Sequence, residues 1–302
     1  MKILIVGLVK NEQLDRLKEE AEKRSHEIDG CYATELVIRA GRNRFDPTLR
    51  GKPLHNYDLI YLWAVGKRRW EWYTAALYLN KKHGAVIVNE KAIAPDYHFY
   101  LTPAIDYLKQ HEANLQFPES AIIFDEKSVD SVIENFNFPL ILKTAEGRQG
   151  KGVFKVGSIE ELKSKIKELK DVSPAFVIRE FIPNDGDVRV FTIGYKVVGA
   201  MKRTPTKEGE FRSNISQGGA GSVFDLEKSP EVKEIAEKLS KLMRTEIAGV
   251  DIMLHKETGQ AFILELNPGP QFMGLEKYTG VNAALEIIKY FEILQGNRET
   301  SK

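Results

Sequence analysis

The stretch AGVDIMLHKETGQAFILELNPGP, residues 248–270, contains two apolar runs separated by a polar segment with a glycine. Apolar runs of this length are typical of buried strands, and the HKETGQ segment between them is typical of a hairpin turn. Pairing the two strands about the centre of that turn places Asp251 opposite Leu264 or Glu265. Glu265 and Asn267 stand two residues apart, so their side chains leave the strand on the same face.

Asp251, Glu265 and Asn267 therefore bring two carboxylates and one amide oxygen to one face of the predicted hairpin. Oxygen ligands without His or Cys are typical of a site for a hard cation, and Mg²⁺ carried by a nucleotide is its natural occupant. Unpaired acids are costly to bury among apolar neighbours, which favours a site that compensates them. The alternative is an exposed strand edge where the acids face water.

A glycine-rich segment, EGRQGKG (146–152), separates predicted strands at 140–143 and 153–156. Glycines carry no Cβ, so the backbone amides of such a loop can approach nucleotide phosphates closely. The segment runs into a strand, whereas a Walker A loop or a Rossmann turn opens a helix. The alternative is a plain hairpin loop with basic residues. The candidate phosphate-binding glycines are Gly147, Gly150 and Gly152.

Basic side chains accompany the loop and the acid pair. Lys143 ends the strand that leads into the loop, and a charge inside an apolar strand usually has a fixed partner, which triphosphate oxygens would supply. The other members of this set are Arg189, Lys202, Arg203 and Arg212. The alternative is structural ion pairing with Glu180, Asp187 or Glu210, and the joint occurrence of the basic residues favours phosphate.

The chain as a whole predicts three units. Alternating strands (3–6, 57–63 and 85–88) and helices indicate an α/β unit with a parallel sheet, and hairpin-like connections further on indicate antiparallel sheets. The expected domains are the α/β unit at 1–94, a linker and small α+β unit with the glycine-rich loop at 95–175, and a second α+β unit with the acidic hairpin at 176–295.

Composition excludes several classes of protein. The 302 residues include 44 basic and 43 acidic ones, a net charge of +1, so nothing indicates a nucleic-acid partner. The one cysteine, Cys31, cannot form an intrachain disulfide and fits a reducing compartment. No run approaches the roughly 20 apolar residues of a membrane span, and the short run at 3–9 is no signal peptide. We expect a cytoplasmic protein without a membrane partner.

From Pro139 to about Asn282, the chain resembles the ATP-grasp ligases, closest to their RimK-type branch. The strings that carry the resemblance are LKTAEGRQGKGV, IREFIPNDGDVRVFTIG, AMKRTPTKEGEFRSNISQGG, AGVDIML and FILELNPGP. They cover about half the chain in the family's order, so chance explains them poorly. The resemblance implies an α/β and α+β fold, in which an N-terminal pre-ATP-grasp domain precedes two α+β subdomains that sandwich ATP. It also implies a homo-oligomer.

The resemblance implies a role for each matching residue. Lys143 and the loop from Gly147 to Gly152 would contact the phosphates, and Asp187 would lie near the ribose. The hinge that binds adenine would be Glu180, Phe181 and Ile182. The stretch that reaches the phosphates and the reacting carboxylate would be Arg212, Ser213 and Asn214, with Arg212 and Lys202 as catalytic residues. The ligands of Mg²⁺, or of Mn²⁺ in its place, would be Asp251, Glu265 and Asn267.

One position departs from the family pattern. Members often carry an Asp-Lys pair at the start of the linker helix, where this chain has Asp96-Tyr97 followed by His98. Lys91 or a basic loop residue would have to replace that lysine, or the contact is absent and nucleotide affinity is weaker.

The activity implied is ATP-dependent joining of a carboxylate to an amine through an acyl phosphate, which needs no protein nucleophile. FRSN followed by Gly218-Gly219 resembles branches that add glutamate to a protein tail or a small cofactor. Two alternatives are a nucleotide-binding protein without ligase activity and a phosphotransferase, although H-R-D and D-F-G, the motifs of protein kinases, do not occur.

An acidic peptide or protein tail would need a basic surface. The stretch KRRWEW (67–72) is one candidate, and Arg39, Arg42, Arg44 and Arg50 add to it. The simpler interpretation is a solvated basic face whose tryptophans pack inward.

Overall fold

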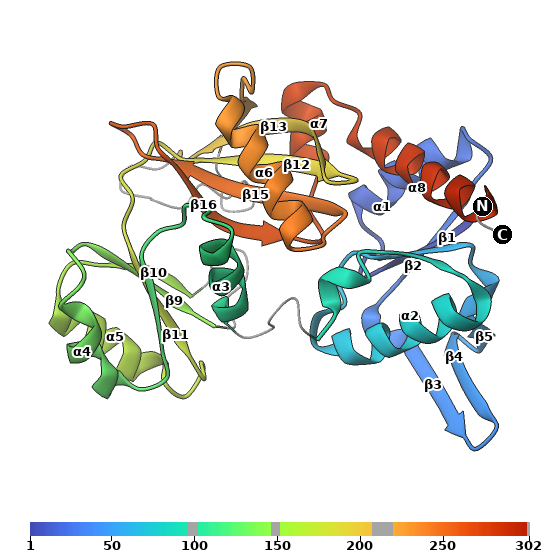
Figure 1. The fold of residues 1–302 in the computed structure, drawn as a ribbon, viewed down its shortest axis with the longest axis horizontal. Coiled ribbons are helices and arrows are strands. Elements are labelled where there is room, and N and C mark those ends of the chain that lie inside the picture. The colour runs from blue at the N-terminus through green and yellow to red at the C-terminus, as the bar shows by residue number, and fades with distance from the viewer. Residues whose placement is uncertain (96–101, 146–151, 207–219, 301–302) are drawn as a thin grey trace.

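The computed structural model describes residues 1–95, 102–145, 152–206 and 220–300 (Figure 1). Four sheets and the helices that cover them form three units around a central cavity. Among the described residues, no helix is long and apolar enough to cross a membrane.

The N-terminal unit is a four-stranded parallel sheet with helices on both faces. Ile3 and Ile5 of its strand β1 pack on the side of α1 and of the C-terminal helix α8 (Ala283–Thr300). Leu4 and Val6 pack on the other side, against α2. A strand buried on both faces is apolar at every position, which is why its sequence shows no alternation. The elements are β2 (Glu27–Cys31), β1 (Lys2–Val6), β6 (Leu59–Leu62) and β7 (Val86–Val88) in sheet order, with α1 (Glu12–Glu22), α2 (Arg69–His83) and the short helices η1 (Ala33–Glu35), η2 (Leu54–Asn56), η3 (Gly66–Arg68) and η4 (Lys91–Ile93).

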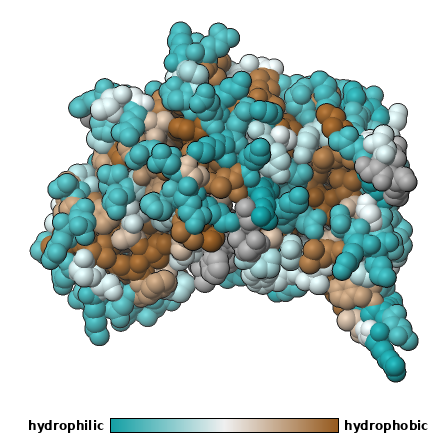
Figure 2. Space-filling view, in the orientation of Figure 1, coloured by the Kyte–Doolittle hydropathy of each residue, from teal (hydrophilic) through white to brown (hydrophobic). Residues whose placement is uncertain are grey.

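A three-stranded antiparallel sheet, which the sequence pattern did not reveal, projects from this unit. Its strands are β3 (Leu36–Gly41), β4 (Arg44–Leu49) and β5 (Lys52–Pro53). Arg39, Arg42 and Arg44 are exposed on the β3–β4 hairpin, whose end is hydrophilic in Figure 2. Arg50 follows the hairpin and pairs with Glu35, with its Nε 2.8 Å from Oε1.

The second unit is an antiparallel sheet covered on one face by the helices α4 and α5, whose bounds are given below. Its strands in sheet order are β10 (Val153–Val156), β9 (Leu140–Thr144), β11 (Phe176–Glu180) and β8 (Ser120–Ile123), and its helices are η5 (Glu126–Ser128), α4 (Val129–Ile133) and α5 (Ile159–Leu169). Helix α3 (Ala104–Glu112) precedes it and lies near the middle of the molecule in Figure 1.

The third unit is a five-stranded antiparallel sheet whose one face packs on α6. Its strands in sheet order are β14 (Ala220–Val223), β13 (Lys196–Thr204), β12 (Asp187–Ile193), β15 (Ile247–Leu254) and β16 (Ala261–Asn267), and its helices are α6 (Pro230–Leu242), α7 (Met273–Thr279) and α8 (Ala283–Thr300). Helix α8 returns to pack on α1, so Ile3, Phe191 and Phe291 share one core cluster. The first and third units are therefore joined by continuous apolar packing.

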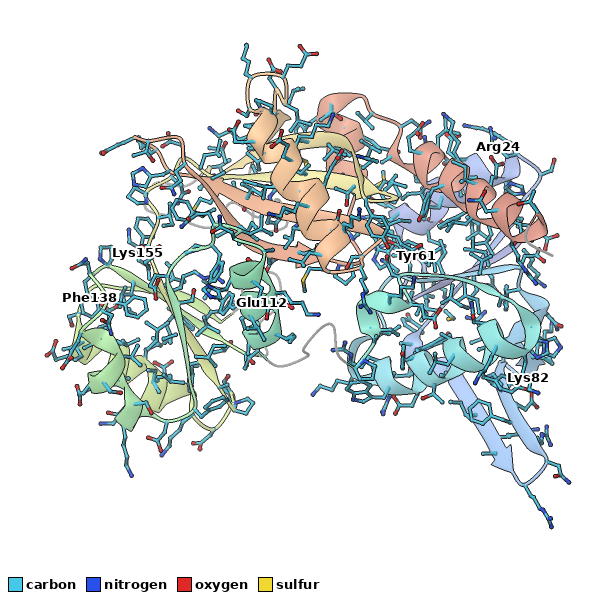
Figure 3. The ribbon with its side chains drawn as sticks, in the orientation of Figure 1. Arg24, Tyr61, Lys82, Glu112, Phe138 and Lys155 are labelled. Atoms are coloured by element: carbon cyan, nitrogen blue, oxygen red, sulfur yellow. The ribbon has the colours of Figure 1, made fainter. Side chains whose placement is uncertain are left out.

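Polar contacts add to this junction. Tyr61, near the centre of Figure 3, donates a hydrogen bond to the carbonyl oxygen of Pro268 at 3.3 Å. Glu246 is largely buried and accepts hydrogen bonds from the amide of Asn89 at 2.7 Å and the hydroxyl of Tyr290 at 3.0 Å. Burial raises the pKa of Glu246 above its ordinary value of 4.5, although both hydrogen bonds oppose the shift.

We expect Glu246→Gln to change how stability depends on pH. Because the pKa of Glu246 is raised on folding, the native chain binds more protons than the unfolded chain above pH 4.5. Its contribution to stability therefore falls as pH rises through the raised pKa. Glutamine cannot ionise, so the melting temperature of the variant relative to the wild type should increase from about pH 4.5 to about pH 8. Glu257→Gln, on an exposed turn, is the control. A difference between Glu246→Gln and wild type that is constant across this range would contradict the expectation.

Candidate active site

A cavity of about 1480 Å³ lies where the three units meet. The four-stranded sheet of the second unit, called the small sheet below, contributes Lys143 and Thr144 to its lining. The five-stranded sheet of the third unit, called the large sheet, contributes Asp251 and Glu265. The N-terminal unit lines it through the start of α1, the end of β6 and the segment 66–69, and α3 lines it as well.

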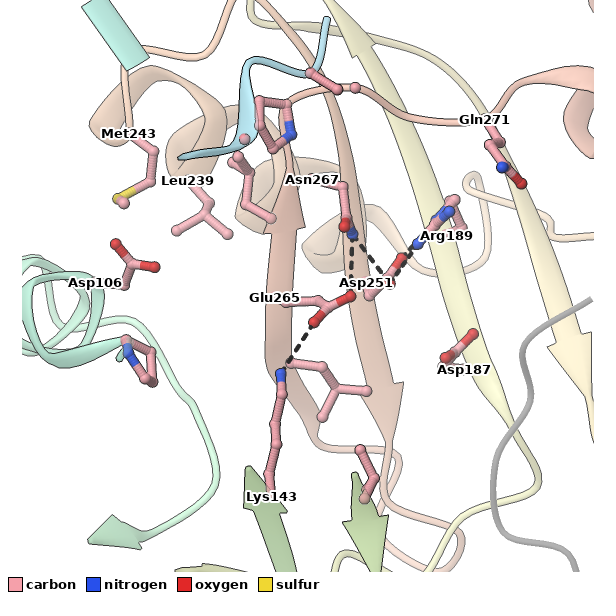
Figure 4. Close-up of a pocket in the computed structure, with 18 of the residues that line it drawn as sticks. Asp106, Lys143, Asp187, Arg189, Leu239, Met243, Asp251, Glu265, Asn267 and Gln271 are labelled. Atoms are coloured by element: carbon pink, nitrogen blue, oxygen red, sulfur yellow. Dashed lines mark hydrogen bonds and ion pairs between the residues drawn. The ribbon is translucent and has the colours of Figure 1, made fainter. Parts of the chain in front are cut away.

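The acidic hairpin forms as its sequence predicts. Strands β15 and β16 pair antiparallel, and Asp251 lies directly opposite Glu265, one of the two partners expected. The register then shifts between Asp251 and Ile252, so that Leu264 of β16 has no partner in the ladder. Asn267 lies within 3.3 Å of both acids, from its Nδ2 to Asp251 Oδ2 and to Glu265 Oε1 (Figure 4). The three side chains thus gather at one point of the cavity wall.

This donor set fits a hard cation. Within the described residues no group of three His, Cys, Asp or Glu side chains could hold a metal, so protein ligands here would be two carboxylates and one amide. Rotating the Asn267 amide by half a turn exchanges its nitrogen and oxygen. The oxygen would then face the same point as the carboxylates of Asp251 and Glu265, where a cation would bind. Two carboxylates and an amide, with nucleotide phosphates completing the shell, match the ligation that Mg²⁺ favours.

Two arginines, predicted to face phosphates, pair with acids instead. Arg189 binds Asp251 through two bonds, Nε–Oδ1 at 2.7 Å and Nη2–Oδ2 at 2.6 Å. Arg203 binds Asp187 at 2.6 and 2.8 Å, and its Nη2 lies 3.0 Å from Asp251 Oδ2. Structural ion pairing, the alternative to phosphate binding, therefore accounts for both arginines. Asp187 lines the cavity, but both of its carboxylate oxygens accept bonds from Arg203.

These pairs keep Asp251 ionised. Burial alone would raise the pKa of Asp251, but the charges and hydrogen bonds of Arg189 and Arg203 outweigh it and hold the pKa below its usual range. Burial would lower the pKa of Arg203, and Asp251 and Asp187 raise it instead. Both oxygens of Asp251 accept bonds from Arg189, so a cation would share this carboxylate with the guanidinium groups that hold it ionised.

Lys143 connects the small sheet with this cluster. It leaves β9 and reaches across the cavity, so that its Nζ lies 3.4 Å from Glu265 Oε2 (Figure 4). A lysine held between two sheets, beside two acids, is placed to contact an anion that enters with a cation.

The predicted hinge, residues 180–182, also lines the cavity. Glu180 is tied to the start of β8, because its Oε1 accepts a bond from the amide of Glu119 at 2.8 Å. The Nζ of Lys155 lies 3.7 Å from the centroid of the Phe181 ring. The carbonyl oxygen of Ile182 accepts a bond from Asn184 Nδ2 at 2.7 Å, so part of its hydrogen-bonding capacity is used within the chain.

Lys202 does not join the cluster. Successive residues of a strand point to opposite faces, and Arg203 takes the cavity face of β13. Lys202 thus shares the other face with Ala200, which packs on α6, and it does not line the cavity. Its catalytic role stays a prediction that the cavity lining does not support, and the strand alternation that separates it from Arg203 is present in the sequence.

Several predicted residues lie outside the described ranges, namely Gly147, Gly150, Arg212, Ser213, Asn214, Asp96, Tyr97 and His98. Gly152 lies within the described residues. Its φ is +79°, and its backbone packs closely against the side chain of Thr144. A Cβ there would lie 2.1 Å from Thr144 Oγ1, so this position needs glycine to close the β9–β10 connection.

The basic stretch 67–72 is divided between the cavity and the core. Trp72 is buried and donates to the carbonyl of Ala33 at 2.9 Å, whereas Trp70 is half exposed. Lys67, Arg68 and Arg69 line the cavity. The arginines of the β3–β4 hairpin do not, so the two groups of basic residues belong to different surfaces.

Comparison with known proteins identifies the family to which this arrangement belongs. The profile of the RimK-like ATP-grasp domain matches residues 103–291. The chain belongs to the RimK-like ATP-grasp family. A probable alpha-L-glutamate ligase of Legionella pneumophila (strain Paris) is 32% identical over 281 residues, which span 92% of this chain and 90% of that protein. A probable alpha-L-glutamate ligase of Stutzerimonas stutzeri is 30% identical over 280 residues, with 92% and 90% covered.

Solved ATP-grasp ligases share the fold. The ligase PsnB, in complex with a minimal precursor, Mg and ADP, superposes with a TM-score of 0.71 at 19% identity, covering 97% of this chain and 98% of PsnB. The D-alanine–D-alanine ligase of Bacillus anthracis, complexed with ATP, gives a TM-score of 0.67 at 16% identity over the full length of both chains. These likenesses confirm the predicted ATP-grasp fold. ATP-grasp ligases use ATP and Mg²⁺, which agrees with the chemistry of the cavity wall.

Proposed function

We propose that this ATP-grasp protein is a carboxylate–amine ligase that joins an amino acid such as glutamate to a peptide, a protein tail or a small cofactor. One observation carries the proposal: across a single cavity, Lys143 of the small sheet contacts Glu265 of the large sheet, which Asn267 joins to Asp251. The relatives named as probable glutamate ligases support the choice of amino acid.

In this proposal ATP lies between the two sheets, with its adenine at residues 180–182 and its phosphates toward Lys143. Asp251, Glu265 and Asn267 would hold Mg²⁺, which when bound neutralises phosphate charge and orients the terminal phosphate. A substrate carboxylate attacks the γ-phosphorus of ATP, ADP leaves, and the amine of the second substrate then displaces phosphate from the acyl phosphate. Lys143 stabilises the negative charge that develops on the transferred group.

The chain's own contribution is positioning. Arg189 and Arg203 keep Asp251 charged and fixed, so the metal-binding acid is in place before substrate enters. We further propose domains at 1–94, 95–175 and 176–295, with α8 returning to pack on the first. Strand β11 (Phe176–Glu180) pairs with β9 and β8 in the sheet of the second unit, so the second boundary belongs after Glu180 rather than at 175. A homo-oligomer remains part of the proposal on the resemblance alone.

Release of ADP from ATP tests this function. We expect release that depends on Mg²⁺, or on Mn²⁺ in its place, when the protein is screened against single amino acids combined with small acidic peptides. Stimulation by one amino acid would name the amine substrate, and mass spectrometry of the product would name the other. Bound ATP with no ADP release in any combination, and none after addition of cell extract, would contradict ligation.

A further inference from the structure

Arg69, the first residue of α2, is a buried cation without hydrogen bonds at two of its nitrogens. The residue is 4% exposed, and its Nε and Nη2 are buried and make no hydrogen bond in the described structure. Part of Arg69 lines the main cavity, and its two unbonded nitrogens are enclosed next to that wall of the proposed active site. Such a group is rare, because an unpaired buried charge costs several kcal/mol and native proteins pair it.

The neighbours of Arg69 explain only part of its burial. Burial lowers its pKa, and the charge of Asp106 on α3 opposes this shift. Its guanidinium carbon lies 5.1 Å from the centroid of the Trp70 ring, a cation–π contact that leaves the N–H donors unused. A purely structural arginine would be expected to bond a carboxylate with its Nε and Nη2, as Arg203 bonds Asp187.

A second residue of the same cavity carries a buried acceptor without a hydrogen bond among the described residues. Gln110 is 6% exposed, it lines the same cavity, and its buried Oε1 has no hydrogen-bond partner in the described structure. Asp106 and Gln110 are four residues apart on α3 and therefore share one face of that helix. The carboxylate that acts on Arg69 thus lies one turn from the free acceptor, on a helix near the middle of the molecule (Figure 1).

We propose that Arg69 and Gln110 form a subsite for an amino-acid unit of the substrate, in which Arg69 binds a carboxylate and Gln110 accepts a hydrogen bond from a neighbouring N–H. The positive charge of Arg69 matches the carboxylate of such a unit, and the unbonded Oε1 of Gln110 matches its N–H. The unit is either a free amino acid or the end of an acidic peptide, since both carry a carboxylate beside an N–H. This inference rests on the proposed ligase function, and it assigns substrate recognition to α2 and α3.

The test combines stability with binding. Because Arg69 is desolvated without full compensation, Arg69→Gln should melt at the same temperature as the wild type or higher in the absence of ligand. The same variant should bind the substrate unit about tenfold more weakly or worse, since charge-assisted bonds are lost. Isothermal titration with L-glutamate and with tri-L-glutamate, both in the presence of Mg²⁺ and ADP, measures this binding. L-glutamine amide, which has no carboxylate, should not bind, and the affinity for ADP should not change.

Arg44→Gln is the matched control, because Arg44 is an exposed arginine of the β3–β4 hairpin outside the cavity. Weakened binding of glutamate alone would identify a free amino acid as the occupant, and weakened binding of the peptide alone would identify an acceptor tail. The proposal is overturned if Arg69→Gln melts markedly lower or fails to fold, if it binds both probes as the wild type does, or if wild type binds neither. Loss of binding in Arg44→Gln instead would move recognition to the hairpin. Arg69-dependent binding without any ADP release would retain the subsite and reject ligation.

Discussion

Glu265→Gln is expected to abolish ATP turnover while leaving the fold intact. The substitution removes one of two negative charges that would hold Mg²⁺, and a metal ion contributes several kcal/mol to stabilising charge on a transferred phosphoryl group. Since each 1.4 kcal/mol is a factor of ten in rate, ADP release should fall about 100-fold or more. Metal-dependent ADP release by purified protein measures the effect.

The structural cost of this substitution should be small. The Glu265 side chain is 46% exposed, and its contacts, with Lys143 Nζ at 3.4 Å and Asn267 Nδ2 at 3.3 Å, are long. A half-exposed ion pair contributes under about 1 kcal/mol, so the melting temperature should change little. Glu257→Gln, in the turn at the other end of the same hairpin, should behave as wild type in both measurements. Unchanged turnover in Glu265→Gln would remove Glu265 from the metal site.

The acidic hairpin is the part of the site that sequence determines most completely. Two apolar strands and one short turn fix the register, because a slip by one residue would turn the apolar side chains to the wrong face. Asp251 therefore had only two candidate partners, and the structure selects Glu265. The parallel N-terminal sheet was predictable for a similar reason, since fully apolar strands alternating with helices leave few other arrangements.

The partners of the arginines could not be predicted in the same way. Strand β12 lies between β13 and β15, which places Asp187 opposite Arg203 and Arg189 opposite Asp251. Cross-strand neighbours of opposite charge form ion pairs, but only the order of the strands reveals who those neighbours are. The sequence shows that an arginine lies in an apolar strand. It does not show whether the partner of that arginine is a bound phosphate or a buried carboxylate. Arg69 lies in the basic stretch 67–72 that the sequence offers for an acidic acceptor, but its burial and its interaction with Asp106 of α3 are visible only in the structure.

Arg203→Met is expected to cause the largest loss of stability among these substitutions. The Arg203 side chain is 4% exposed and is bonded to two buried acids, Asp187 and Asp251. Methionine replaces the apolar stem but leaves Asp187 without its guanidinium, and breaking a buried pair on one side costs about 3–5 kcal/mol. Urea unfolding followed by circular dichroism gives the change in the free energy of unfolding.

Two further variants make this expectation specific to the ion pair. Asp187→Asn removes the other charge, so the double variant should lose less free energy of unfolding than the two single losses combined, by about 1 kcal/mol or more. Lys202→Met is the matched control, because it removes a cation one position away on the opposite face and should cost under about 1 kcal/mol. Strictly additive losses would mean that Arg203 and Asp187 are not paired in solution. Asp251 would then be the acid that accounts for the burial of Arg203, through the contact of its Oδ2 with Arg203 Nη2 at 3.0 Å.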